Sequence, residues 1–130
     1  MAAEKPKRKP ARPRPLTSRQ RALLACQACL DFKAEEPVIL NVAKLTSFTD
    51  YFVIVSGRSN RQVQAMAEGV VQAIRAQGSR ELSTEGEAEG RWVVVDWGDV
   101  VVHIFEPSLR DFYDLEKLWG DAKRLKPPKI

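Results

Sequence analysis

The chain has 130 residues, of which 44% are hydrophobic and 29% are charged. These values are typical of one globular domain with a single packed core. The longest apolar runs, of about five residues, are far shorter than the roughly 20 that a membrane-spanning helix needs. No apolar stretch follows the first methionine, so we expect no secretion signal and predict a cytoplasmic protein.

The 21 basic and 17 acidic residues are unevenly distributed. Residues 1–21 hold eight Lys and Arg against one acid, and the last ten residues hold four against one. The body between them, residues 22–120, carries nine basic and fifteen acidic residues, a net charge of −6. This distribution favours a body that binds a basic protein, with tails free to touch nearby RNA.

Residues 1–16 predict a disordered, basic, proline-rich tail, because prolines at positions 6, 10, 13 and 15 oppose both helix formation and packing. The same prolines argue against an amphipathic mitochondrial targeting helix. Two roles for the tail stay open: a solvated segment with no fixed role, and a weak contact with RNA.

A helix is predicted after the tail, capped by Thr17 or Ser18 and closed before Pro37, which disfavours helical geometry in the residue before it. Cys26 and Cys29 lie in this helix. We interpret them as small apolar core residues in a reducing compartment, because they lack the second ligand pair of a zinc site and the strand-to-helix turn of a redox pair.

Two strands and a second helix follow. Residues 38–42 and 50–56 predict strands, and the second strand, apolar on both faces, is expected near the centre of the sheet. Ser59 or Asn60 then caps a helix over 61–77, which Gly78 ends. The acidic loop over 79–90 has room for one short edge strand.

The segment from Arg91 to Phe105 predicts a β-hairpin, because two valine-rich runs flank the turn residues Asp-Trp-Gly-Asp at 96–99. Alternation puts ordinary core residues on one face: Val93, Val95, Val100, Val102 and Ile104. The other face mixes apolar and ionisable groups: Trp92, Val94, Asp96, Val101, His103 and Phe105. Since such a hairpin usually shows water a plainly polar face, we interpret the mixed face as a docking surface.

A final helix is predicted over 107–120, with Phe112, Leu115 and Leu118 in the core. The order α-β-β-α-(β)-β-β-α predicts an α/β fold, a mixed sheet of four to five strands with helices packed on it. We expect the domain over 17–121 and a basic C-terminal tail over 122–130.

Several stretches carry a family resemblance. The pattern W-V-V-V-D-x-G-D-V-V-V-H-x-F begins at Trp92, and R-x-F-Y-D-L-E-x-L-W-G-D begins at Arg110. Upstream, 40–42, 49–54 and 56–63 match in the same order. Over nearly the whole chain these stretches resemble the ribosomal silencing factors, the RsfS or Iojap family. The resemblance implies a nucleotidyltransferase-like α/β fold with no enzymatic activity and no cofactor.

The resemblance also implies a translation repressor that binds the large ribosomal subunit through its protein L-fourteen. Such a protein occupies the face where the small subunit docks, blocks subunit joining sterically and represses translation under nutrient limitation. An acidic body with an apolar, Trp-bearing strand face suits a basic ribosomal protein. The basic tails could touch ribosomal RNA peripherally, and the exposed hairpin face could pair two copies off the ribosome.

The candidate partner-binding residues lie on the hairpin and the last helix: Trp92, Val94, Asp99, Val101, His103, Tyr113 and Glu116. Trp92 leads this set because tryptophan is enriched in interface hot spots, and the resemblance implies that the tryptophan at this motif position contacts L-fourteen. The competing interpretation makes Trp92 a lid over the core. No catalytic or metal-ligating residue is predicted, and His103, the sole histidine, is interpreted as a contact or structural residue.

Two other classes of function stay open. The turn over 56–59 superficially resembles the phosphate-holding turn of nucleotidyltransferases, but the nearby carboxylates, Asp96 and Asp99, straddle a turn, so we interpret 56–59 as a helix cap. A direct RNA-binding module is disfavoured by the acidic body. Asp50 either caps a turn or contacts a partner.

Overall fold

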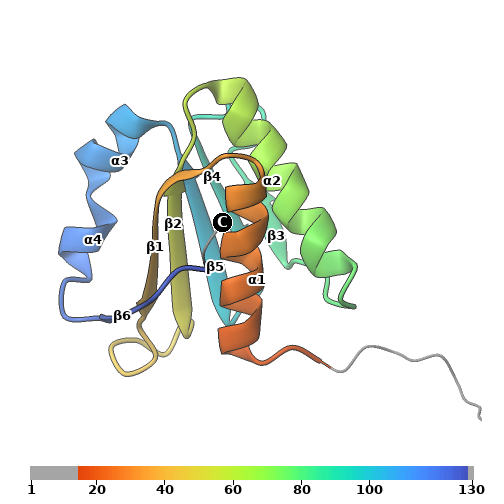
Figure 1. Ribbon diagram of the computed structural model, residues 1–130. Coiled ribbons are helices and arrows are strands. Elements are labelled where there is room, and N and C mark those ends of the chain that lie inside the picture. Colours follow the sequence, from red (N-terminus) through yellow and green to blue (C-terminus); the bar gives the residue numbers. More distant parts are fainter. Residues whose placement is uncertain (1–14, 129–130) are drawn as a thin grey trace, which may run out of the picture.

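The computed structural model describes residues 15–128 as one mixed sheet with helices on both faces (Figure 1). The helices are α1 (Ser18–Asp31), α2 (Asn60–Arg75), α3 (Pro107–Tyr113) and α4 (Leu115–Leu118). The strands are β1 (Glu35–Asn41), β2 (Tyr51–Ser56), β3 (Ser83–Glu85), β4 (Trp92–Asp96), β5 (Val100–Phe105) and β6 (Lys123–Leu125).

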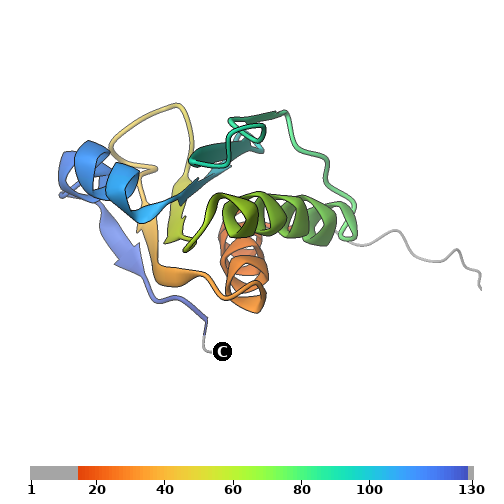
Figure 2. The ribbon, with the colours of Figure 1, turned by 90° about the horizontal axis from the view of Figure 1, so that it is seen from above.

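The sheet has six strands in the order β3-β4-β5-β2-β1-β6, and every neighbouring pair is antiparallel except β2 and β5. The predicted mixed α/β class is confirmed, with one strand more than expected. Helices α1 and α2 pack on one face, which we call the inner face, and α3 and α4 lie on the other, the outer face (Figure 2). No helix in residues 15–128 combines the length and apolar character needed to cross a membrane.

The first helix begins as the sequence predicts. The Thr17 hydroxyl accepts the Gln20 N–H, and the Gln20 side-chain oxygen accepts the Thr17 N–H, which completes a capping box. Of the predicted tail over 1–16, only Pro15 and Leu16 belong to the described residues, so that prediction lies outside the structure.

The main core lies between the inner face and helices α1 and α2. Val95 pairs with Val102, and the five hairpin residues predicted for the core are completely buried there, which confirms the predicted sorting of the two faces. Cys26 and Cys29 lie in the same core as free thiols, and burial raises the pKa of Cys26 to about 11 and also raises that of Cys29. They are therefore packing residues.

The predicted helix over 107–120 is wrong as one continuous element, because Asp114 divides it into α3 and α4. Asp114 adopts a left-handed conformation, with φ 46° and ψ 58°, which Asp tolerates better than most residues. Its carboxylate then accepts the Lys117 N–H and caps α4. Phe112 and Leu118 are 76% and 72% exposed, so the expectation that both are core residues is also wrong.

The predicted C-terminal boundary also differs from the structure. Residues 123–125, expected in a basic tail, form β6 and pair with residues 39–41 of β1. Leu125 packs against the main core and Ala122 against the smaller outer cluster. The folded domain therefore continues past residue 121, and two basic residues expected in a tail, Lys123 and Arg124, belong to a strand of the sheet.

Candidate partner-binding surface

The outer face of the sheet is covered over only part of its width. Leu109, Leu115 and Trp119 of the α3–α4 segment pack around a smaller core of Leu40, Val42, Ile54 and Phe105. This covers the outer side of β1, β2 and the end of β5. The side chains of β4 and of the start of β5 stay partly accessible, so the apolar hairpin face is open at its outer margin (Figure 2).

Trp92 lies at the boundary between the covered and open parts. Its indole packs against Phe105, with ring centroids 4.9 Å apart, and against Tyr113 of α3, at 4.7 Å. Trp92 is half-buried and Tyr113 is 47% exposed. The indole therefore belongs to an aromatic cluster that keeps an accessible side, and it is not buried beneath the helices.

His103 lies beside Trp92 on the neighbouring strand and is 8% exposed. The Trp92 indole N–H donates to His103 Nδ1 at 3.2 Å, so the proton of the neutral imidazole resides on Nε2. Nε2 is buried and has no hydrogen-bond partner among the described residues. Burial lowers the His103 pKa from 6.5 to about 4, so the imidazole is neutral at pH 7.

This neutral histidine predicts acid sensitivity. Because the folded pKa is about 4 and the unfolded one 6.5, the contribution of His103 is fully present above pH 6.5 and is lost as pH falls toward 4. The loss is roughly 3 kcal/mol in the free energy of unfolding. Urea unfolding of the wild type and of His103→Gln, measured from pH 7.5 to pH 4.5, should show the wild type losing more stability. Parallel pH curves for the two proteins would contradict the assignment.

Val94 and Val101 complete the open patch. Val94 pairs with His103 and Val101 with Asp96, and all four point to the outer face. Both valines are half-buried. We call the set of Trp92, Val94, Val101, His103 and Tyr113 the hairpin surface, in which His103 is buried and the other four side chains are partly accessible or exposed. These are five of the seven residues that the sequence singled out, and the structure brings them together.

Acidic side chains flank the hairpin surface. Glu85 pairs with Val94 from β3 and is exposed, and Asp96 pairs with Val101. Paired residues point to the same face, so both carboxylates lie beside the valines. The apolar patch therefore has a negatively charged margin.

Asp99 is not part of the hairpin surface. Its carboxylate forms an ion pair at 2.5 Å with Arg21 of α1, the helix that covers the inner face. Asp99 lies in the turn before β5, which begins at Val100, so strand alternation does not fix the side to which its carboxylate points. Asp50, for which the sequence left open a turn cap or a partner contact, also contacts α1. Its carboxylate accepts the Ser18 hydroxyl at 2.9 Å.

Glu116 supports the surface from α4. It forms two hydrogen bonds, each of 3.1 Å, with the guanidinium of Arg110, which is 5% exposed. Arg110 also donates to the buried Ser56 hydroxyl at the end of β2. This network joins α3 and α4 across the break at Asp114 and fastens both to the sheet, next to Tyr113.

The turn over 56–59 is occupied by contacts within the protein. The Ser59 hydroxyl accepts the Gln62 N–H, and the Gln62 side chain accepts the Arg58 N–H, so the turn caps α2 as predicted. Asp96 accepts the Gly98 N–H. Within residues 15–128 no three acidic, histidine or cysteine side chains cluster as a metal site would require.

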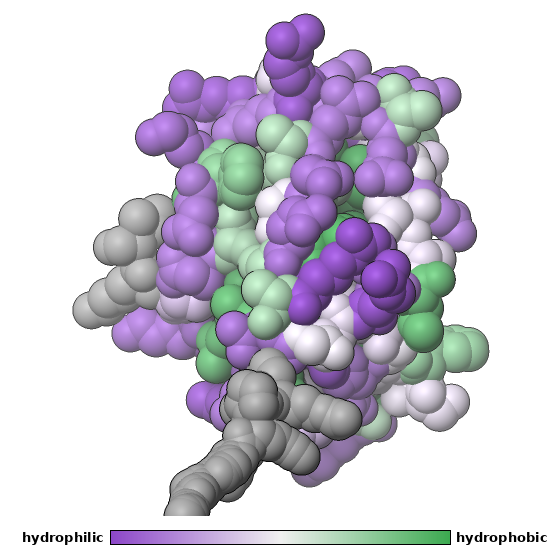
Figure 3. Space-filling view, turned by 90° about the vertical axis from the view of Figure 1, so that its right-hand side faces the viewer, coloured by the Kyte–Doolittle hydropathy of each residue, from purple (hydrophilic) through white to green (hydrophobic). Residues whose placement is uncertain are grey.

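Sequence reasoning missed several exposed apolar residues. Phe48, in the loop between β1 and β2, is 87% exposed, and Phe112 and Leu118 flank a shallow hollow over α3 and α4. The helical spacing of the sequence indicates neither the break at Asp114 nor the exposure of these two residues. By contrast, the side of the molecule formed by α2 and its neighbours is largely hydrophilic (Figure 3).

The structure defines the class as a small α/β protein whose sheet carries a partly accessible, mainly apolar patch on its outer face. The chain matches the family described as "Ribosomal silencing factor during starvation" over residues 15–130. It is 46% identical over 99 residues to "Ribosomal silencing factor RsfS" of Halalkalibacterium halodurans, covering 76% of this chain and 85% of that one. It is 43% identical over 100 residues to the protein of the same name in Chromobacterium violaceum, covering 77% and 82%.

A crystal structure of a Chromobacterium violaceum protein superposes with a TM-score of 0.79 at 37% identity, over 88% of this chain and 92% of that chain. The chain belongs to the RsfS family of ribosomal silencing factors.

Proposed function

We propose that this protein represses translation by binding the large ribosomal subunit through ribosomal protein L-fourteen and sterically blocking the small subunit. The family name supports a regulatory factor that acts on ribosomes rather than an enzyme. The observation that carries the proposal is the hairpin surface, where an indole, a phenol and two valines remain accessible on a sheet face that is otherwise covered.

The chemistry of this surface suits a basic protein partner. Interface hot spots are enriched in Trp and Tyr, and the rings of Trp92 and Tyr113 pack against each other in this surface, with centroids 4.7 Å apart. The carboxylates of Glu85 and Asp96 lie at its margin and would attract a positively charged protein during approach. Asp99 and Glu116 act through Arg21 and Arg110 in the free protein, so we assign them supporting roles.

The sequence-based expectations on partners and location carry over as parts of the same proposal. The protein acts in the cytoplasm without a cofactor, and the basic N-terminal segment touches ribosomal RNA peripherally. Off the ribosome the hairpin surface pairs two copies, because an apolar patch of this kind gains stability when it is covered.

A subunit-joining assay tests the proposal. Purified large subunits are incubated with the protein, small subunits are added, and the mixture is separated on a sucrose gradient. We expect fewer joined ribosomes and the protein in the large-subunit fraction, and we expect immobilised protein to capture isolated L-fourteen. Normal joining at saturating protein, or capture of large subunits that does not depend on L-fourteen, would refute the mechanism.

A further inference from the structure

We infer that the folded domain carries a second binding surface, at the β6 edge of the sheet, which takes the phosphate backbone of RNA. This β6 surface consists of Arg19, Asn41, Lys44, Lys123 and Arg124. The inference rests on the proposed function in one respect: the ribosome supplies the RNA. It concerns a different part of the molecule from the hairpin surface.

Two hollows lie side by side at this edge. The first, of about 330 Å³, is lined by Asn41 and Lys44 from the end of β1 and its loop and by Lys123 of β6. The second, of about 200 Å³, adds Arg19 of α1 and Arg124 of β6. Because Asn41 and Lys123 line both hollows, the basic residues form one continuous surface.

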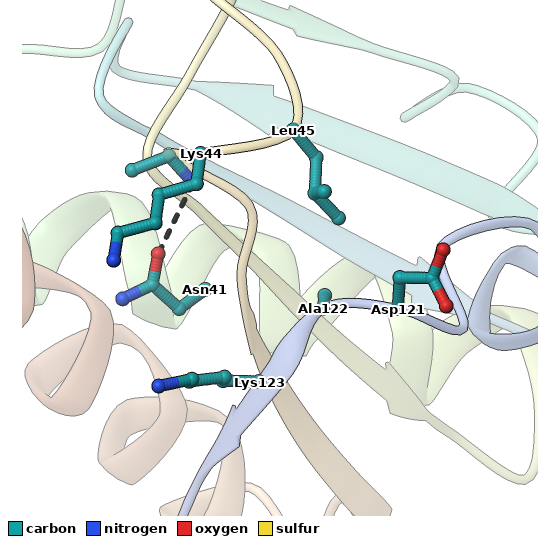
Figure 4. A pocket seen from close by; sticks show the side chains of 7 residues that line it. Asn41, Lys44, Leu45, Asp121, Ala122 and Lys123 are labelled. Atoms are coloured by element: carbon teal, nitrogen blue, oxygen red, sulfur yellow. Dashed lines mark hydrogen bonds between the residues drawn. The ribbon is translucent and has the colours of Figure 1, made fainter.

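The first hollow presents hydrogen-bond donors on one side. Asn41 Oδ1 accepts the Ala43 N–H at 3.1 Å, which leaves the amide NH₂ to donate outward. Figure 4 shows this amide nitrogen between the ammonium groups of Lys44 and Lys123, all three directed to the same side. The carboxylate of Asp121, which also lines the hollow, points away from them. Such an arrangement suits an anion with several oxygens.

The charges of this surface are not neutralised within residues 15–128. Arg21, Arg58, Arg75 and Arg110 each form an ion pair with a carboxylate elsewhere in the fold. The four cations of the β6 surface form none with the described residues. All four are exposed, so no residue of the described part of the chain keeps an external ligand from them.

Three features favour a polyanion over a single small anion. Successive hollows that share residues match the repeated phosphates of a backbone. The pairing of β6 with β1 holds Lys123 opposite Asn41, so the donors are spaced by the sheet. Arg19 lies in the first turn of α1, and the sequence before that helix contributes six further basic residues within positions 1–14. RNA is the polyanion that the proposed ribosomal site offers.

The test is RNA binding by the full-length protein, measured by fluorescence anisotropy with a labelled 20-nucleotide single-stranded RNA across a salt titration. We expect Lys44→Gln/Lys123→Gln to bind about tenfold more weakly at low salt. Its dependence of log affinity on log salt should be shallower by about 1.4, because two phosphate contacts are lost. The matched control is Arg61→Gln/Arg80→Gln, which removes two exposed charges elsewhere and should bind like the wild type.

Each other outcome overturns the inference. If the lysine variant binds RNA with unchanged affinity, the β6 surface has no role in RNA binding. If the control variant binds RNA as weakly as the lysine variant, the loss of affinity comes from the lower net charge and not from the β6 surface. A poly-glutamate peptide of similar charge is the second probe. If the lysine variant loses binding to this peptide but not to RNA, the surface binds an acidic protein instead.

The failure of this inference can be told apart from failure of the proposed function. Lys44→Gln/Lys123→Gln should still capture isolated L-fourteen, because neither residue belongs to the hairpin surface. Trp92→Glu should lose L-fourteen and keep its affinity for RNA. Retention of L-fourteen by Trp92→Glu would end the proposed function and leave the RNA result standing.

Discussion

Trp92→Glu is expected to abolish co-sedimentation with large ribosomal subunits while the protein stays folded. The substitution removes a half-buried indole from the hairpin surface and puts a carboxylate in its place. Loss of an aromatic hot spot costs about 3 kcal/mol, or roughly 150-fold in affinity. Sedimentation at increasing subunit concentration measures the loss, and circular dichroism checks the fold.

The matched control for this variant is Ala65→Glu. Ala65 is exposed on α2, which packs on the inner face, so the control adds the same charge on the opposite side of the sheet. It should pellet with large subunits like the wild type. If Trp92→Glu also pellets normally, the hairpin surface is not the site of contact, whatever the family resemblance implies.

Arg110→Met is expected to cause the largest loss of stability among the substitutions considered, about 3 kcal/mol in the free energy of unfolding. The guanidinium is 5% exposed and binds both Ser56 and Glu116, so its removal leaves a hydroxyl and a carboxylate without their partner. Methionine fills most of the space, which separates the loss of charge from the loss of volume. Urea unfolding at pH 7 measures the difference.

Arg91→Met provides the comparison. Arg91 is more than half exposed and lies 3.7 Å from the Glu106 carboxylate, so its removal should cost less than about 1 kcal/mol. Equal losses for the two variants would show that the buried network contributes nothing special. Should Arg110→Met fail to fold, Glu116→Gln keeps the shape of the network, removes one charge and should give a smaller loss in the same direction.

The two faces of the hairpin could be predicted because they depend only on the order of residues within the segment 92–105. Alternation along the segment 92–105 fixes which side chains share a face, and the pairing of Val95 with Val102 agrees with it. Most of the candidate surface follows from that alternation alone. Tyr113 joins the surface through the position of α3, which helical spacing placed only approximately.

The errors arise where a conformation or a pairing is not encoded in the local pattern. Asp114 takes a left-handed conformation inside a stretch whose spacing is helical throughout, so one predicted helix becomes two short ones, on which Phe112 and Leu118 are exposed. Lys123 to Leu125 form a strand only because β1 lies alongside. Asp99 leaves its expected face because it lies in the turn before β5 and because Arg21, 78 positions earlier, holds its carboxylate.

The pairing of β6 with β1 protects an edge of the sheet against aggregation. Strand β1 has seven residues, and its outward edge is blocked in two ways: β6 covers 39–41, and Pro37 offers no N–H toward the other end. A chain truncated after residue 120 would expose the backbone edge of residues 39–41, which could then pair with a strand from another copy. Strand β6 thus prevents another copy of the chain from extending the sheet at this edge.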